Sequence, residues 1–335
     1  MLADTARALV AEGKGILAAD ESTGTIKRRF DAIGVESTRE SRRAYRELLF
    51  TSEGVEEWIS GVILFDETIR QSSADGTPFP QLLESNGIIP GIKVDQGAQP
   101  LANAPGETIT EGLDGLRERF EEYRGLGARF AKWRGVYSIG DGRPSEYAVW
   151  TNAHALARYA ALAQEAGLVP IVEPEVLMDG THTIEQAYHV TARVQHAVFT
   201  ELRDQRVEFE GMLLKPNMVL AGYDAPKQAS VEEVAEATIR CLRHHVPAAV
   251  PGIVFLSGGQ SDELATEHLD AINRLGDQPW QLSFSYGRAL QDAAQHTWLG
   301  SPDNVRAAQD AYRKRARLNG LARSGRYTPD LEHAV

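Results

Sequence analysis

The chain has 335 residues, of which 42% are hydrophobic and 24% charged, so it has ample material for a packed core and lacks the composition of a disordered protein. Its 35 basic and 47 acidic side chains give a net charge of -12, which argues against broad binding to nucleic acid or anionic membrane, because those partners require positive surface. A phosphorylated small molecule therefore requires a local basic pocket.

Eight short apolar runs, each bounded by glycine, proline or charge, indicate strands. In chain order they cover residues 15–20, 62–67, 88–95, 128–137, 168–176, 211–218, 252–259 and 281–288. Between most of them lie segments with apolar residues three and four positions apart, which predict helices. These helices cover residues 39–50, 113–126, 152–167, 184–204, 231–245 and 261–275.

This alternation implies parallel strands joined by helical crossovers, and eight such units predict an α/β fold, a (β/α)8 TIM barrel in a single domain. The alternative is an open doubly wound sheet, which requires a G-x-G-x-x-G loop after the first strand, and "AADESTGTIKRR" contains no such loop. We expect the barrel to cover residues 1–319. Residues 320–335 are expected to form a mobile C-terminal tail, since this segment contains Gly325 and Pro329 and lacks apolar periodicity.

A cytoplasmic location is expected from three features. Cys241 is the only cysteine, so no intrachain disulfide can form, and "MLADTARALV" lacks the long apolar core of a signal peptide. The longest nearly apolar stretch, residues 246–256, holds two prolines and is too short to span a bilayer. No membrane or nucleic-acid partner is expected.

Charged side chains gather at the C-terminal ends of the predicted strands, where barrels of this type build their active sites. These ends supply Asp20, Asp66, Glu67, Lys93, Asp95, Lys132, Arg134, Glu173, Glu175, Lys215, Ser257 and Arg288. A single charge inside an apolar strand is also compatible with a buried ion pair that only fixes the packing. Three lysines on separate strands favour a functional site, because burying each ammonium is costly unless it is paired.

Lys215 is the best candidate for a nucleophile, because it lies in the most apolar strand, within "EGMLLKPNMV". Crowded ammonium groups and partial burial disfavour the charged form, so we expect the pKa of one lysine of the set to fall from about 10.4 toward roughly 7 to 8. Such a lysine can attack a ketone to give a Schiff base, which stabilises a carbanion without a metal. Glu173 and Asp20 are available as the acid and the base of this chemistry.

A phosphate site is predicted at the last two strands. "LSGGQ" at residues 256–260 supplies backbone amides just before a helix that starts near Ser261. Alone this motif is compatible with a plain tight turn. Arg288 in "SYGRAL" lies at the neighbouring strand end, and its guanidinium completes a candidate phosphate clamp.

The chain resembles class I fructose-bisphosphate aldolases over nearly its whole length. The matching stretches occur in family order and are "GKGILAADESTGTIKRR", "GIKVDQG", "FAKWRG", "PIVEPEVL", "EGMLLKPN", "FLSGGQS" and "FSYGRALQ". The resemblance implies a glycolytic lyase that reversibly cleaves fructose 1,6-bisphosphate to dihydroxyacetone phosphate and glyceraldehyde 3-phosphate through a lysine Schiff base. It also implies phosphorylated ketose and triose ligands, no cofactor and a homotetramer.

Matching positions give the site residues their implied roles. The catalytic set is Lys215 for the Schiff base, Glu173 as acid and base with Glu175 in support, Asp20 for the substrate hydroxyl proton, and Lys132 and Lys93 to place or polarise substrate oxygens. The clamp for one phosphate comprises Ser257, Gly258, Gly287 and Arg288. The region for the other phosphate comprises Ser22, Thr25, Arg28 and Arg29, with Arg134 near it.

Two stretches depart from the family pattern. Thr25 and Arg28 stand where many relatives have serine and lysine, which keeps the donor chemistry. The chain ends "YTPDLEHAV", whereas well-known animal members end in tyrosine. Tyr327 is the only phenol of the tail, and a closing tail would bring its hydroxyl to the enamine on Lys215 as a proton donor. Packing of its ring on the barrel rim is the alternative.

Other functions remain as alternatives, namely an aldolase for another ketose phosphate and a barrel scaffold protein without activity. A zinc-dependent aldolase requires clustered ligands, but His182, His189 and His196 would lie about 10 Å apart along a helix, so no metal site is expected. A carboxylate pair such as Asp20 and Glu173 suits glycoside hydrolysis. That function leaves the three lysines unexplained.

Overall fold

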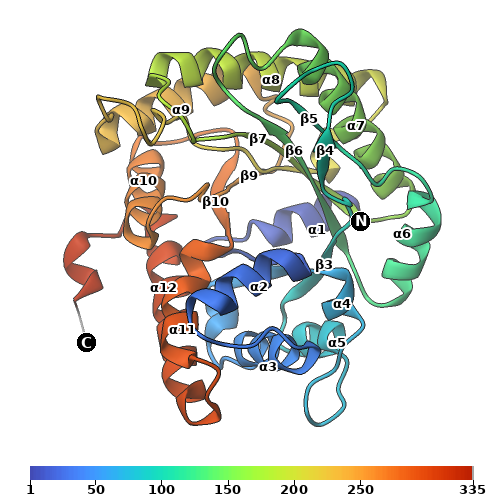
Figure 1. Ribbon diagram of the computed structural model, residues 1–335, viewed down its shortest axis with the longest axis vertical. Coiled ribbons are helices and arrows are strands. Elements are labelled where there is room, and N and C mark those ends of the chain that lie inside the picture. Colours follow the sequence, from blue (N-terminus) through green and yellow to red (C-terminus); the bar gives the residue numbers. More distant parts are fainter. Residues whose placement is uncertain (334–335) are drawn as a thin grey trace.

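Eight parallel strands close into a barrel in the structure, a computed structural model that describes residues 1–333 (Figure 1). The strands are β1 (Gly15–Ala19), β2 (Ile59–Leu64), β3 (Ile89–Lys93), β6 (Phe130–Tyr137), β7 (Val169–Val176), β8 (Leu213–Leu214), β9 (Gly252–Phe255) and β10 (Gln281–Tyr286). Each pairs with the next along the chain, and β1 closes the barrel by pairing with both β2 and β10. The predicted TIM barrel is confirmed.

Helices surround the barrel (Figure 1). They are α1 (Leu2–Leu9), α2 (Thr23–Ala32), α3 (Arg39–Phe50), α4 (Asp66–Ile69), α5 (Phe79–Ser85), α6 (Leu116–Gly125), α7 (Glu146–Glu165), α8 (Ile184–Asp204), α9 (Val231–His245), α10 (Asp262–Arg274), α11 (Arg288–Trp298) and α12 (Val305–Ala322). Thr38, Thr183 and Ser230 form capping boxes that fix the starts of α3, α8 and α9. Within the described part of the chain, no helix is both long enough and apolar enough to cross a bilayer.

One end of the barrel is filled with apolar side chains. Ala6 and Leu9 of α1 pack with Ile16, Phe130 and other inward-facing strand residues in one buried cluster. The approach of α1 requires a glycine on β2, because a Cβ on Gly61 would lie 2.6 Å from Cδ2 of Leu9. The opposite end, where the strands terminate, is therefore the end left for charged side chains.

Some predicted elements have different limits in the structure. The sixth predicted strand, residues 211–218, is only two residues long as β8. The backbone N–H of Lys215 still donates to the carbonyl of Val172 at 2.8 Å, so Lys215 keeps its place beside β7. Asp66 begins α4 rather than ending a strand. An antiparallel pair, β4 (Ala98–Pro100) and β5 (Thr108–Thr110), was not predicted, because all three residues of β4 are exposed and carry no apolar pattern.

The C-terminal segment packs on the outer helices. Helix α12 continues past residue 319 to Ala322, and a short 3-10 helix follows at Pro329–Glu332. The ring of Tyr327 is buried, and its hydroxyl donates to Oε1 of Glu332 at 2.9 Å. Glu332 in turn pairs with Arg315 of α12 at 2.6 Å. Residues 334–335, the end of the expected tail 320–335, lie outside the described residues, and the mobility of that tail stays a prediction.

Candidate active site

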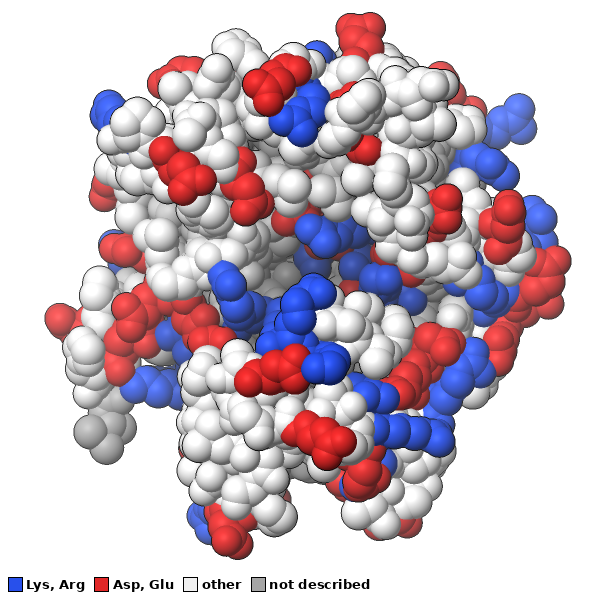
Figure 2. Space-filling view, viewed as in Figure 1, with Lys and Arg blue, Asp and Glu red and all other residues white. Residues whose placement is uncertain are grey.

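A cavity of about 1250 Å³ opens at the C-terminal ends of the strands. Figure 2 shows Lys and Arg side chains gathered around this hollow, although the protein as a whole is acidic. The predicted site residues that line it are Asp20, Ser22, Thr25, Arg28, Arg29, Lys93, Lys132, Arg134, Glu173, Glu175, Lys215, Ser257, Gly258, Gly287 and Arg288. Tyr327 is not among the lining residues. It lies beside a separate groove formed with α9 and α10.

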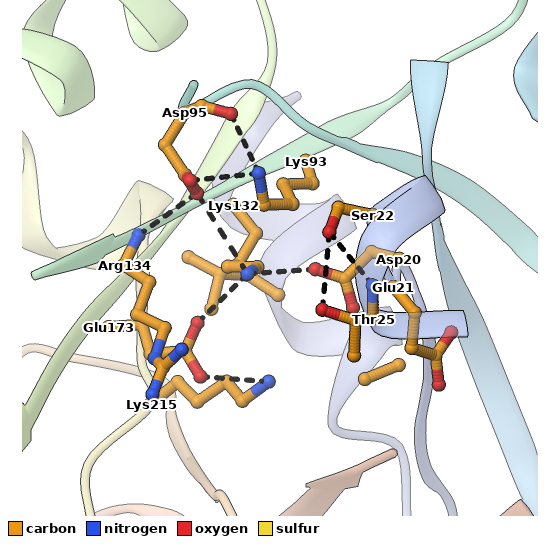
Figure 3. A network of polar contacts seen from close by, with 12 residues as sticks. Asp20, Glu21, Ser22, Thr25, Lys93, Asp95, Lys132, Arg134, Glu173 and Lys215 are labelled. Carbon is orange, nitrogen blue, oxygen red and sulfur yellow. Dashed lines mark hydrogen bonds and ion pairs between the residues drawn. The ribbon is translucent and has the colours of Figure 1, made fainter. Parts of the chain in front are cut away.

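Four charged side chains meet at the floor of the cavity (Figure 3). The ammonium of Lys215 lies 3.1 Å from Oε1 of Glu173, and the ammonium of Lys132 lies 3.1 Å from the other oxygen of that carboxylate. Lys132 also contacts Oδ2 of Asp20 at 2.8 Å. Lys215, Glu173 and Lys132 are each 4% exposed. Lys132 in β6, Glu173 in β7, and the residues directly after β1 and β8, Asp20 and Lys215, thus form a single contact network.

The contacts of the network keep Asp20, Glu173 and Lys132 charged in spite of burial. Burial disfavours the carboxylate of Asp20, but the ammonium groups of Lys132 and Lys215 outweigh it and hold the pKa of Asp20 well below its usual range. The pKa of Glu173 is lowered in the same way, with Lys132 as the largest opposing charge. For Lys132, burial is outweighed by Asp20, Glu173 and Asp95, and its pKa rises. Lys132 is therefore held protonated, which disqualifies it as a nucleophile at neutral pH.

Asp95 is part of this network, although the sequence reasoning gave it no role. Its Oδ1 lies 2.8 Å from the ammonium of Lys93, and its Oδ2 lies 4.0 Å from that of Lys132. The signal was present, because Asp95 follows Lys93 at a predicted strand end. The sequence did not reveal the register of β3 with β6. This register pairs Lys93 with Lys132 across the sheet.

Glu175 and Arg134 form a second pair at the mouth. The guanidinium Nε of Arg134 donates to Oε2 of Glu175, and the carboxylate is buried while Arg134 is more exposed. Burial raises the pKa of Glu175 even though Arg134 opposes the change. Glu175 is thus more easily protonated than Glu173, two residues earlier on the same strand.

The predicted clamp residues lie together. The loop after β9 places Gly258 and Gly259 at positive φ, 58° and 98°, a conformation that side chains rarely adopt. Arg288 is the first residue of α11, and a Cβ on Gly259 would lie 3.3 Å from its Nη2. The small residues therefore let the guanidinium approach the loop closely, which suits a phosphate held by backbone amides and an arginine.

In the second predicted phosphate region, Ser22, Thr25 and Arg28 contact one another, whereas Arg29 has a different partner. Ser22 caps α2, and its Oγ lies 3.2 Å from Oγ1 of Thr25, which accepts from Nη2 of Arg28 at 3.4 Å. Arg29 turns the other way and pairs with Glu21. Its Nη2 would lie 3.8 Å from a Cβ on Gly287, so Arg29 lies beside the clamp.

Metal ligands do not cluster in the described part of the chain. Among residues 1–333, no group of three or more His, Cys, Asp or Glu side chains is arranged to hold a metal ion. His182 is buried, and burial lowers its pKa, while Cys241 is a buried free thiol.

Comparison with known proteins agrees with this geometry. A family model described as fructose-bisphosphate aldolase class-I matches residues 1–335. A probable fructose-bisphosphate aldolase class 1 from Xanthomonas campestris is 59% identical over 97% of this chain and 98% of its own length. Fructose-bisphosphate aldolase 6, cytosolic, from Arabidopsis thaliana is 55% identical over 96% of this chain and 89% of its own length.

A solved structure extends the likeness to three dimensions. Fructose-bisphosphate aldolase from Plasmodium falciparum, in complex with TRAP and a small-molecule inhibitor, superposes with a TM-score of 0.97 at 51% identity. The match covers 98% of this chain and 95% of that chain. With the full-length family match and relatives at more than half identity, the chain belongs to the class-I fructose-bisphosphate aldolase family.

Proposed function

We propose that Lys215 is the nucleophile with which this enzyme reversibly cleaves fructose 1,6-bisphosphate to dihydroxyacetone phosphate and glyceraldehyde 3-phosphate. The observation that carries the proposal is the contrast between two buried lysines. Lys132 pairs with three carboxylates, whereas among residues 1–333 the one carboxylate within ion-pair distance of Lys215 is that of Glu173, at 3.1 Å. Lys215 therefore has fewer carboxylate partners than Lys132, which favours it as the attacking amine.

The contact with Glu173 supplies a proton route for Schiff-base formation. Lys215 passes its proton to Glu173 and attacks the ketone carbon, forming a carbinolamine. Glu173 then returns the proton to the carbinolamine hydroxyl, which leaves as water, and an iminium remains. One carboxylate thus acts first as base and then as acid, a role that its position beside both Lys215 and Lys132 supports.

Asp20 is proposed as the base for cleavage. Its carboxylate, kept ionised by Lys132, accepts the proton of the substrate hydroxyl beyond the bond that breaks. The electrons of the carbon–carbon bond flow into the iminium, which gives an aldehyde and an enamine on Lys215. Lys132 and Lys93 stabilise substrate oxygens electrostatically, and Glu175 supports Glu173 as a nearby carboxyl.

Two groups of donors are proposed to hold the substrate phosphates. Ser257, Gly258, Gly287 and Arg288 form the clamp for one phosphate. Ser22, Thr25 and Arg28, with Arg134 near them, receive the other. The backbone amides after β9 and the guanidinium of Arg288 provide charge-assisted contacts of the kind that phosphates favour.

Borohydride trapping tests the nucleophile and the expected independence from metal together. We expect purified enzyme with dihydroxyacetone phosphate and EDTA to retain full activity and to yield, on reduction, one adduct that peptide mass mapping assigns to Lys215. A metal-dependent aldolase would lose activity in EDTA and regain it with zinc. An adduct chiefly on Lys93 or Lys132 would show that Lys215 is the wrong nucleophile.

The role of Tyr327 in returning a proton to the enamine also stays a prediction. The structure requires Tyr327 to leave its contact with Glu332 and its place beside α10 before its hydroxyl reaches the cavity. We expect a chain truncated before Tyr327 to exchange protons on dihydroxyacetone phosphate more slowly, with Schiff-base formation less affected, and Tyr327→Phe to reproduce part of the defect. Exchange at the wild-type rate in the truncated enzyme would assign that proton to another group.

The homotetramer implied by the family resemblance and the cytoplasmic location stay predictions. The preference for fructose 1,6-bisphosphate over other ketose phosphates also stays a prediction, since all of these substrates share the unit that is cleaved. A scaffold without activity is the remaining alternative, and retention of the complete charged network argues against it.

A further inference from the structure

Glu21 is a buried charge that the proposed reaction does not use. It follows Asp20 on the chain and lines the cavity, but its carboxylate points to the helices rather than to Lys132. Oε2 accepts from Nη2 of Arg46 at 2.5 Å. Oε1 accepts from Arg29 and from Nε2 of Gln291, the latter at 2.8 Å. Four residues thus meet in what we term the Glu21 hub: Glu21 between β1 and α2, Arg29 of α2, Arg46 of α3 and Gln291 of α11.

Hydrogen bonds of the Gln291 amide tie the hub to the barrel. Gln291 donates through Nε2 to the carbonyl of Ala18 in β1 at 2.8 Å as well as to Glu21. Its Oε1 accepts from the Tyr45 hydroxyl at 3.1 Å and from Arg46 at 3.3 Å. Gln291 has no exposed surface and Arg46 is 2% exposed. These contacts fix the carboxylate of Glu21 from behind.

The outer side of the hub carries an excess of positive charge. Two guanidinium groups, those of Arg29 and Arg46, share the single carboxylate of Glu21, so the hub holds one net positive charge. Burial alone would raise the pKa of Glu21, but Arg46 and Arg29 outweigh it and lower that pKa, so the carboxylate stays ionised. Asp20 offers little compensation, because it pairs with Lys132. An anion in the cavity would balance the charge.

Of the two guanidinium groups of the hub, that of Arg29 reaches the cavity. Its side chain is 23% exposed, against 3% for that of Arg46. The pair with Glu21 uses Nη1, while Nη2 is the atom that would lie 3.8 Å from a Cβ on Gly287. Gly287 and Arg288 belong to the proposed clamp, and Gln291 follows Arg288 by one turn of α11.

We propose that Glu21, fixed by Arg46 and Gln291, is a positioning residue that presents Arg29 to the phosphate bound at Gly287 and Arg288. Arg29 thereby becomes the second guanidinium of that clamp instead of a ligand of the phosphate near Ser22. Glu21 acts only through Arg29 and touches no reacting atom. The inference rests on the proposed clamp and adds to it a residue that spacing along the chain does not indicate.

A double-mutant cycle on inhibition by inorganic phosphate tests this role. We expect Arg29→Gln and Glu21→Gln each to raise the Ki of phosphate roughly tenfold, the size of one lost charge-assisted contact. Because both changes remove the same contact, the double variant should also show about a tenfold rise rather than about a hundredfold. Glu21→Asp should restore part of the affinity. An additive double variant, or a normal Ki in Glu21→Gln, would overturn the role of Glu21.

Two further variants serve as a control and as a substitute for Glu21→Gln. Glu67→Gln breaks the Arg42–Glu67 pair, 2.7 Å long and outside the cavity, and should leave the Ki unchanged. Should Glu21→Gln fail to fold by circular dichroism, Gln291→Met removes one contact to Glu21 without changing charge. It should raise the Ki in wild type and have no effect once Arg29 is glutamine.

Arg288→Ala separates the inference from the proposal on which it rests. A raised Ki in Arg288→Ala confirms the clamp, and an additive cycle would then reject Glu21 alone. An unchanged Ki in Arg288→Ala would reject the clamp and the inference together. Neither result bears on the nucleophile, which the borohydride adduct reports independently.

Discussion

Lys215→Met is expected to lose both turnover and the covalent adduct, with kcat for fructose 1,6-bisphosphate falling by about 10⁴-fold or more. Methionine has nearly the length of lysine and suits the buried site, so the change removes the amine without leaving a large cavity. Without it no iminium forms, and the carbon–carbon bond has no electron sink. Lys132 cannot take over, since three carboxylates keep it protonated.

Steady-state cleavage assays and borohydride reduction with dihydroxyacetone phosphate measure both losses. The matched control is Lys227→Met, which changes an exposed lysine in the same way and should keep wild-type turnover and adduct. Glu173 loses one of its two ammonium partners in Lys215→Met, so a thermal melt should accompany the assay. An adduct in a folded Lys215→Met protein would assign the Schiff base to another lysine.

The barrel could be predicted from the sequence because buried parallel strands appear as continuous apolar runs. That signal located all eight strands, including β8, whose regular part is only two residues long. It failed for the β4 and β5 pair, which is exposed. It also gave no indication of α1, which closes the apolar end of the barrel through contacts with strands distant in the sequence.

The charged network was predictable to the level of residue types and strand ends. Parallel strands bring their carboxyl ends to one face, so Lys132, Glu173 and Lys215 were expected to meet. The direction of a side chain is not fixed by that rule. Arg28 and Arg29 are neighbours in sequence, yet Arg28 contacts Thr25 whereas Arg29 turns to Glu21.

The direction of a side chain such as that of Arg29 depends on partners that are distant in the sequence. Glu21 is held by Arg46, 25 residues away, and by Gln291, 270 residues away. Tyr327 likewise lies against residues from earlier helices, and its backbone N–H donates to Asp270 at 2.8 Å. Composition and periodicity carry no information about these pairs, so the sequence did not indicate either contact.

Asp20→Asn should separate cleavage from Schiff-base formation. The amide keeps the shape of the side chain and an oxygen that can accept from Lys132, but it cannot take the substrate hydroxyl proton. We expect kcat for cleavage to fall about 10²- to 10⁴-fold, the range typical of a lost general base. Formation of the Schiff base, which the proposal assigns to Lys215 and Glu173, should change far less.

Trapping makes the separation measurable. In Asp20→Asn, borohydride reduction of enzyme incubated with fructose 1,6-bisphosphate should capture the uncleaved ketose on Lys215, because the iminium forms and then stalls. In wild type the same reduction should capture mainly the triose. The control is Asp31→Asn, which removes an exposed carboxylate paired with Lys27 and should leave both turnover and trapped species unchanged.

The lowered pKa of Asp20 also predicts how wild-type turnover depends on pH. Lys132 and Lys215 lower the pKa of Asp20, so the wild-type carboxylate remains ionised as the pH falls through the usual range of aspartate titration, and the base is lost only below that range. Any acid limb of the wild-type kcat profile near neutral pH must then come from another group. If Asp20→Asn abolished that limb, or lost trapping in parallel with turnover, Asp20 would act before cleavage and the assignment of the two carboxylates would have to be exchanged.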